Sequence, residues 1–250
     1  MSFSIILPTL NEKGHILKLI DNISQIFINE KKNFEVIVVD DSSTDGTQEL
    51  VETQAKKSPY LRVISRKNIK RNLPDSLNDG IKIARHENII WLDADFQHPP
   101  KYIKNFIETS AKYDAIIYSR FLNESDRYFK NNELEKKINE NQSYFFNQLC
   151  RTLLFKDITD YTSGFICIKK KIFSNYSLKG YYGDYFVDLI VHLKQNNKKI
   201  IEIPFKDAIR ASGQSKTMVT INARYLYTCF NYFLALLKSY LKFKFNYKSD

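Results

Sequence analysis

Short apolar runs alternate with amphipathic stretches over the first half of the chain. The apolar runs predict buried strands at residues 3–7, 34–39, 61–64, 89–92 and 115–118. Apolar residues at helical spacing predict a helix from residue 16 to 27, and a second helix is predicted at 47–56. This alternation is typical of an α/β fold of the Rossmann type, with a mainly parallel sheet covered by helices.

The second half of the chain is less regular. Residues 121–143 are strongly polar, which favours a mobile surface segment or an exposed helix, and we interpret them as a lid or an acceptor-side loop. Further strands are predicted at 166–168 and 199–203, with a helix at 185–195 between them. Mixed pairing would extend the sheet. We therefore expect one domain over residues 1–216 and a C-terminal amphipathic helical segment over 217–250.

That C-terminal segment contains the run YLYTCFNYFLALL, followed by several lysines. About 13 mostly apolar residues are too few to cross a hydrocarbon core of roughly 30 Å as a helix. The segment could instead lie in a membrane interface, with its lysines on anionic head groups. The alternative is a terminal helix packed on the domain or on a second subunit, so that a homo-oligomer stays open.

Charge and composition narrow the classes of partner. Lysine and arginine number 38 against 28 aspartates and glutamates, which gives a net charge of +10 and favours an anionic partner. Nucleic acid is not expected, because no recognition-helix, zinc or aromatic RNA-binding signature is present; a basic nucleic-acid-binding protein is the non-enzyme alternative. Three scattered cysteines indicate neither disulfides nor a zinc site. Without a signal-peptide pattern or an 18-residue apolar run, we expect a cytoplasmic protein, peripheral on the cytoplasmic membrane face.

Acidic turns follow two of the predicted strands, where ligands bind in open sheets of this kind. Asp93 and Asp95 are two residues apart, so that both carboxylates can face one ligand. Such hard oxygen ligands suit Mg²⁺ or Mn²⁺ bound together with a diphosphate. A lone D-x-D is more often a solvated turn, but the buried strand before it favours a site. Asp40 and Asp41 close the second strand in the same way.

Several motifs, taken in order, resemble the family 2 glycosyltransferases of the GT-A fold, and most closely their polyprenyl-phosphate (dolichol-phosphate) mannosyltransferase branch. The matching segments are PTLNE, VVDDSSTDGT, LDADFQHPP, DYTSGF, IPF and IRASGQSK. The segment LDADFQHPP is similar to the family's M-D-A-D-L-Q-H-P-P almost letter for letter. The matches run in family order over residues 4–216, which is far more specific than any one motif.

The resemblance implies a nucleotide-sugar donor, GDP-mannose-like or a UDP-sugar, and a set of residues that line its pocket. These residues are Pro8, Leu10, Glu12, Val39, Asp41, Asp93, Ala94, Arg210 and Lys216. Leu10 stands where the family usually has tyrosine. Where the family shows a glycine-rich run before its third helix, this chain has residues 71–76, RNLPDS.

The same resemblance implies a divalent cofactor, Mg²⁺ or Mn²⁺, with Asp95 and Gln97 as direct ligands. Asp93 would contact the nucleotide sugar, or the metal through water. Arg210 and Lys216 would hold the donor diphosphate and stabilise the leaving group as charge develops. Asp93, Asp95, Arg210 and Lys216 are thus the expected catalytic residues.

For the acceptor, the resemblance implies a polyprenyl phosphate whose phosphate meets Arg120. We expect inverting transfer, and an acceptor that is already anionic needs no strong base. The alternative is transfer to a surface glycan or oligosaccharide, in which case Asp160 or Asp188 is a candidate base. The family's loop for the lipid phosphate has no clear counterpart at residues 136–141, KKINEN.

Overall fold

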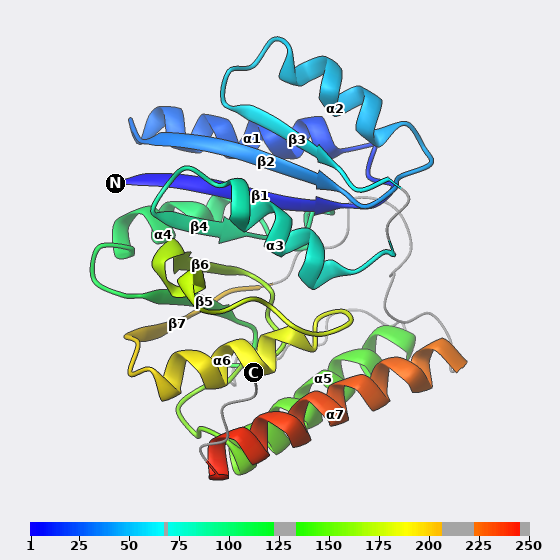
Figure 1. Cartoon of the computed structure of the whole chain (residues 1–250), viewed down its shortest axis with the longest axis vertical. Coiled ribbons are helices and arrows are strands. Elements are labelled where there is room, and N and C mark those ends of the chain that lie inside the picture. Colours follow the sequence, from blue (N-terminus) through cyan, green and yellow to red (C-terminus); the bar gives the residue numbers. More distant parts are fainter. Residues whose placement is uncertain (68–69, 123–133, 207–222, 246–250) are drawn as a thin grey trace.

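A seven-stranded sheet forms the centre of the part of the chain that the structure describes (Figure 1). The computed structural model describes residues 1–67, 70–122, 134–206 and 223–245. The strands are Ser2–Thr9 (β1), Asn33–Asp40 (β2), Leu61–Ser65 (β3), Asn88–Trp91 (β4), Ala115–Ser119 (β5), Ile166–Lys169 (β6) and Ile200–Pro204 (β7). All seven predicted strands are present, most of them a residue or two longer than predicted.

The strands lie in the order β3-β2-β1-β4-β6-β5-β7. β6 is antiparallel to both of its neighbours, and the other pairings are parallel. The predicted mixed α/β sheet is therefore confirmed. β1 pairs with β2 on one side and with β4 on the other, which brings the ends of these three strands together.

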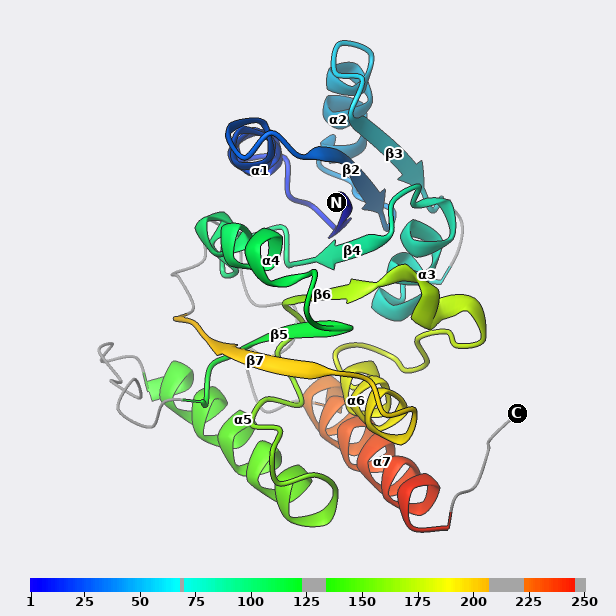
Figure 2. The ribbon, with the colours of Figure 1, turned by 90° about the vertical axis from the view of Figure 1, so that its left-hand side faces the viewer.

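Helices cover both faces of the sheet (Figure 2). They are Ile16–Asn29 (α1), Thr47–Ala55 (α2), Leu73–Ile83 (α3), Ile103–Thr109 (α4), Leu134–Leu153 (α5), Tyr185–Gln195 (α6) and Ala223–Phe245 (α7). Side chains of α1, α2 and α4 belong to one hydrophobic cluster, and those of α3 and α6 belong to the other. Alternation along β1 explains the two faces, because Ile5 and Leu7 enter the first cluster while Ile6 enters the second.

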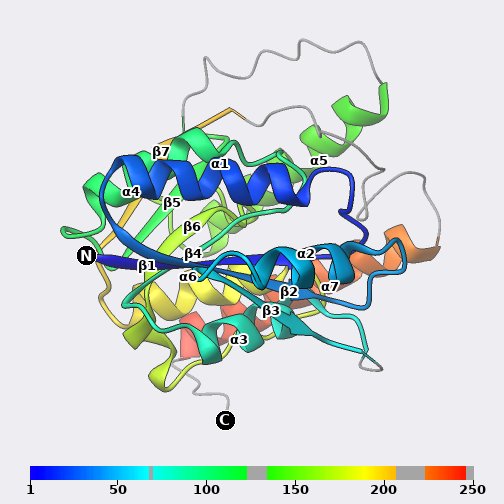
Figure 3. The same cartoon turned by 90° about the horizontal axis from the view of Figure 1, so that it is seen from above.

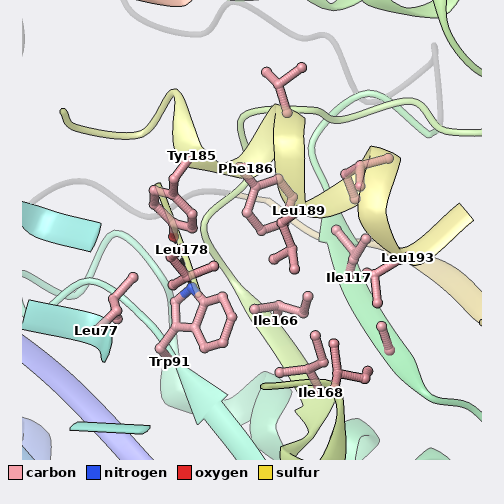
Figure 4. Packing of buried hydrophobic residues seen from close by; sticks show 14 of the residues in the cluster. Leu77, Trp91, Ile117, Ile166, Ile168, Leu178, Tyr185, Phe186, Leu189 and Leu193 are labelled. Carbon is pink, nitrogen blue, oxygen red and sulfur yellow. Dashed lines mark hydrogen bonds between the residues drawn. The ribbon is translucent and has the colours of Figure 1, made fainter. Parts of the chain in front are cut away.

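The core under α6 is closed by large aromatic side chains (Figure 4). Trp91 at the end of β4 is 2% exposed, and its indole Nε1 donates a hydrogen bond to the Tyr185 hydroxyl over 2.9 Å. Tyr185 is the first residue of α6, so the bond fixes the start of this helix beside the end of β4. The segment before α6 is thereby held close to the acidic turn that follows β4.

A helix was one of the two forms expected for residues 121–143, and α5 begins at Leu134; the interpretation as a lid or loop was wrong from there onward. The first part of this helix is mostly polar and therefore shows no clear helical period of apolar residues in the sequence. Its second part supplies Cys150 to the core cluster, with Leu149 and Leu153 packed against that cluster, and such tertiary packing stabilises the helix.

Helix α7 packs beside α6 and α5 rather than extending away from them. Leu236 is buried in the core cluster, and Phe243 stacks edge-on against Phe155 at 4.8 Å between ring centroids. Figures 1 and 3 show that α7 begins on the side of the molecule where β1 and β2 end. The start of α7 is therefore near the edge of the sheet at which ligands are expected.

Candidate active site

The carboxyl ends of β1, β2 and β4 lie side by side and bring three predicted motifs together. Thr9 pairs with Asp40 across β1 and β2, and Ile6 pairs with Trp91 across β1 and β4. The segments after these strands enclose a cavity of about 180 Å³. The residues that line it are Pro8, Thr9, Leu10, Glu12, Asp41, Arg71, Asn72, Leu73, Ser76, Asp93, Ala94, Asp95, Tyr181 and Tyr182.

Hydrogen bonds connect the PTLNE segment after β1 to the DSSTDGT segment after β2. The backbone amides of Asn11, Glu12 and Lys13 donate to Ser43, Thr47 and Asp45, respectively. Asn11 has a positive φ of 57°, and its side-chain oxygen accepts from the Thr44 amide at 2.7 Å. The PTLNE turn is therefore built against the DSSTDGT turn.

The two aspartates after β2 have different surroundings. Asp40 is fully buried and accepts hydrogen bonds from the amide and hydroxyl of Ser43, so it shapes the turn. Asp41 lines the cavity, and its two oxygens accept from the Arg66 guanidinium at 2.7 Å and from the Asn72 amide at 2.9 Å. Asp41 is thus held in one orientation at the cavity wall.

Arg66 is the centre of a buried ionic cluster that the sequence did not reveal. It is 3% exposed and pairs with Asp79 at 2.9 Å as well as with Asp41. Its guanidinium also donates to the Asn72 carbonyl and to the Ser76 hydroxyl. Because a buried charge needs such partners, Arg66 ties the start of α3 to the end of β2.

The acidic turn after β4 is also firmly built. The Asp95 side chain accepts from the Gln97 amide at 2.9 Å, and the Asp93 amide donates to His98 Nδ1 at 2.9 Å. Nδ1 of His98 must therefore be unprotonated, and its ring stacks on Phe165 at 4.9 Å. Phe96 between the aspartates and the histidine has a positive φ of 67°. By these contacts His98 shapes the turn that follows β4.

The donor set at the cavity fits a divalent cation shared with a ligand. Asp93 and Asp95 line the same cavity, and carboxylate oxygens are the ligands that Mg²⁺ prefers. Within the described ranges, no group of three His, Cys, Asp or Glu side chains is arranged to hold a metal by itself. A Mg²⁺ ion that is bound by one or two carboxylates and by phosphate oxygens does not need such a group.

The family model for glycosyl transferase family 2 matches residues 4–177, which include all of these turns. The chain belongs to glycosyl transferase family 2. Two curated relatives are named dolichol-phosphate mannosyltransferase. The Pyrococcus furiosus protein is 29% identical over 221 residues, which cover 86% of this chain and 59% of that protein. The Mycosarcoma maydis protein is 26% identical over 231 residues, covering 90% of this chain and 76% of that protein.

A solved structure shows the same fold. Glucosyl-3-phosphoglycerate synthase from Mycobacterium tuberculosis, in complex with Mn²⁺, UDP and glucosyl-3-phosphoglycerate, has a TM-score of 0.65 and 18% identity. The match covers 95% of this chain and 79% of that one. The predicted GT-A fold is confirmed.

Arg120 of this family 2 chain lies at the end of β5, where Asp160 holds it. Its Nε and one terminal nitrogen donate to the two Asp160 oxygens at 2.8 and 2.9 Å, and the latter nitrogen also donates to Thr162. Asp160 is fully buried; burial alone would raise its pKa, but the Arg120 guanidinium holds that pKa below its usual value. The Arg120 side chain is 25% exposed.

These contacts argue against the two candidate bases. Both oxygens of Asp160 are bound to Arg120, and a carboxylate of lowered pKa is a poor proton acceptor. Asp188 on α6 accepts from the Tyr176 hydroxyl and from Lys242 of α7, and it does not line the cavity. The interpretation of either residue as a general base is therefore not supported by its surroundings.

Three of the predicted site residues that the structure describes are not at the cavity wall. Val39 is fully buried in the core cluster, because its side chain points to the sheet face that α3 covers. It therefore does not line the pocket as predicted. Gln97 and Arg120 lie outside the set that lines the cavity. Arg210 and Lys216 lie outside the described residues.

The cavity also contains residues that sequence reasoning did not assign to it. Arg71 and Asn72 come from the segment where this chain departs from the glycine-rich family pattern. Tyr181 and Tyr182 come from the loop before α6. The signal for the tyrosines was the pair of aromatic residues between Gly180 and Gly183, a composition that suits a binding loop more than a core element.

Proposed function

We propose that the chain transfers a sugar from a nucleotide-sugar donor to a polyprenyl phosphate, with inversion at the anomeric carbon. The observation that carries this proposal is the meeting of Asp41, Asp93 and Asp95 at one cavity in a family 2 chain. The names of the curated relatives support a lipid-phosphate acceptor and a mannosyl donor.

On the donor side, Asp95 and Gln97 would hold a Mg²⁺ or Mn²⁺ ion, which would supply positive charge to the leaving nucleoside diphosphate. Asp93 binds the nucleotide sugar or a metal-bound water, while Asp41, held by Arg66, faces the nucleoside. Arg210 and Lys216, from the IRASGQSK motif, hold the same diphosphate as it departs.

On the acceptor side, Arg120 binds the lipid phosphate, and Asp160 orients the guanidinium. A phosphate oxygen attacks the anomeric carbon from the face opposite the leaving group. Because that oxygen is already anionic, no side chain has to remove a proton. This agrees with the absence of a suitable base among the residues discussed above.

The lipid acceptor also requires contact with a membrane, and α7 offers a surface for it. Its outward side chains form an apolar stripe, each of them between 43% and 61% exposed: Leu226, Phe230, Phe233, Leu237 and Leu241. Lys238 and Lys244 are exposed on the same helix. None of the helices in the described ranges is long and apolar enough to span a bilayer. We propose that α7 lies in the interface of an anionic membrane.

The test is a transfer assay with radiolabelled GDP-mannose and UDP-glucose, polyprenyl phosphate, and Mn²⁺. We expect labelled sugar to become extractable into organic solvent with one of the two donors, and no such product without metal. An oligosaccharide acceptor is assayed in parallel. Label on the oligosaccharide alone would refute the lipid acceptor and favour a glycan-extending transferase.

A further inference from the structure

The loop of residues 180–184 forms one wall of the cavity and is braced from behind by helix α7. Tyr181 and Tyr182 line the cavity, and Gly183 follows them. A Cβ atom on Gly183 would overlap the Tyr232 hydroxyl and lie 3.5 Å from its ring carbon Cζ. The tip of Tyr232 is therefore packed directly on the Gly183 backbone.

Tyr232 is itself fixed by its neighbours. Its ring packs edge-on against Phe146 of α5, with 5.3 Å between ring centroids. One turn and a half earlier on α7, Tyr227 makes a second edge-on contact, at 5.2 Å, with Tyr181 of the loop. Lys242 fastens the other end of α7 to Asp188 of α6 at 2.9 Å. The helix is thus a firm support for the loop.

Within the loop, one carboxylate organises the backbone. Asp184, which is 6% exposed, accepts hydrogen bonds from the amides of Tyr181 at 3.0 Å and Tyr182 at 2.6 Å. The Asn72 side chain donates to the Gly180 carbonyl at 3.1 Å. The loop therefore connects the wall of the cavity that contains Asn72 to the helix that carries Tyr232.

The environment of Tyr232 includes charged groups from both parts of the proposed site. Burial raises the pKa of its hydroxyl, and the charges that act on it include those of Asp184, Arg120 and Asp93. Asp93 belongs to the donor side and Arg120 to the acceptor side. A side chain of α7 is therefore within electrostatic reach of both.

We infer that Tyr232 is a positioning residue of the active site: by its contact with Gly183 it sets the place of Tyr181 and Tyr182 in the donor cavity. This inference rests on the proposed function and adds that α7, whose outer face meets the membrane, supports the donor cavity with its inner face. A displacement of α7 would consequently change the KM for the donor more than it changes kcat.

The inference can be tested by adding a side-chain atom at Gly183 and then removing the Tyr232 hydroxyl that it would overlap. Gly183→Ala places a methyl group where the Tyr232 hydroxyl lies, and overpacking of this kind moves the weaker partner. Tyr232→Phe removes that oxygen and leaves only the ordinary contact to Cζ. The double variant G183A/Y232F should therefore restore the loop. Tyr240→Phe, the same change elsewhere on α7, is the matched control.

The first readout needs no ligand. Hydrogen–deuterium exchange of the Tyr181 and Tyr182 amides should accelerate in G183A, return to the slower rate in G183A/Y232F, and stay fast in G183A/Y240F. The two double variants share the loop sequence of G183A, so intrinsic exchange rates are matched. Thermal unfolding of each variant checks that the fold is retained.

The second readout is donor kinetics in the transfer assay. The KM for the donor should rise roughly tenfold in G183A, equivalent to about 1.4 kcal/mol, with kcat nearly unchanged and with recovery in G183A/Y232F. Wild-type exchange rates in G183A, or a defect that Y232F does not relieve, would overturn the inference. Failure of the wild-type chain to transfer any sugar contradicts the proposed function instead, and the exchange measurement still decides the role of Tyr232.

Discussion

Aspartates that follow neighbouring strands differ in role because their neighbours differ. Asp40 satisfies the amide and hydroxyl of Ser43 and serves the turn, whereas Asp41 is held by Arg66 at the cavity wall. Asp95 lines the same cavity beyond β4. Residue type alone does not separate these roles, but hydrogen-bond partners do.

Replacement of Asp95 tests its proposed role as a metal ligand. Asp95→Asn keeps the shape of the side chain but removes the charge that binds the cation. We expect sugar transfer to fall by roughly a hundredfold or more, because charge stabilisation of the leaving group depends on that cation. Asp21→Asn, on the exposed surface of α1, is the matched control and should retain activity. Equal activity in the two variants would contradict the metal site.

Replacement of Arg120 tests its proposed role in binding the acceptor phosphate. Arg120→Lys keeps a positive charge but loses the paired hydrogen bonds to Asp160. The KM for polyprenyl phosphate should rise roughly tenfold, while the affinity for the donor nucleotide stays unchanged. Steady-state kinetics with each substrate varied in turn measure both. A change confined to the KM for the donor would contradict this role and indicate that Arg120 contacts the donor instead.

Glu202 gives a prediction of pH dependence. Burial raises its pKa to about 7, against the hydrogen bonds from Thr159 and the Asp160 amide. Since the folded state holds this proton more tightly than the unfolded chain does, the contribution to stability is complete below about pH 4.5 and is lost as the pH rises to about 7. Urea unfolding at several pH values should show that loss in the wild type but not in Glu202→Gln.

Individual site residues could be predicted where a motif fixes both the residue type and its place after a strand. Asp41, Asp93 and Asp95 are of this kind, and all three line the cavity. Arg66 was not predictable, because it follows a strand outside any motif and its role depends on partners distant in sequence, such as Asp41 and Asp79. Val39 shows the converse, since the motif includes it but the sheet turns its side chain into the core.

Among the secondary-structure elements, all seven strands were predicted, whereas the helices α3, α4 and α5 were given no predicted bounds. An apolar run between turn residues identifies a buried strand such as β4. α4 has only the seven residues Ile103–Thr109, too few for a clear helical period, and α5 begins in a polar run. Both are stabilised by tertiary packing, with Phe106 and Cys150 fully buried.

The outward stripe of α7 leads to a prediction for this element. The double substitution F230S/F233S removes two exposed rings and leaves the inward contacts of Leu236 in place. Sedimentation with vesicles that contain anionic lipid should fall severalfold, because interfacial binding scales with buried apolar area. Ile28→Ser, a similarly exposed apolar residue on α1, should bind as the wild type does. Unchanged sedimentation of the double variant would argue for a protein partner at this face.

For the molecule as a whole, the sequence predicted the α/β class and a mixed sheet but not the strand order. β6 enters between β4 and β5, and no local pattern reports which neighbours an antiparallel strand chooses. That insertion brings the DYTSGF segment, with Asp160, to Arg120 at the end of β5. The contact between Asp160 and Arg120 thus follows from topology rather than from spacing in sequence.

We propose above all that the cavity beside Asp41, Asp93 and Asp95 binds a nucleotide together with a divalent cation. Isothermal titration of the full chain with GDP and with UDP, each with Mn²⁺ and again with EDTA, measures this directly. We expect saturable binding of one nucleotide in Mn²⁺, weakened at least tenfold in EDTA. Absence of binding for both nucleotides, or binding of the same strength in EDTA, would contradict it.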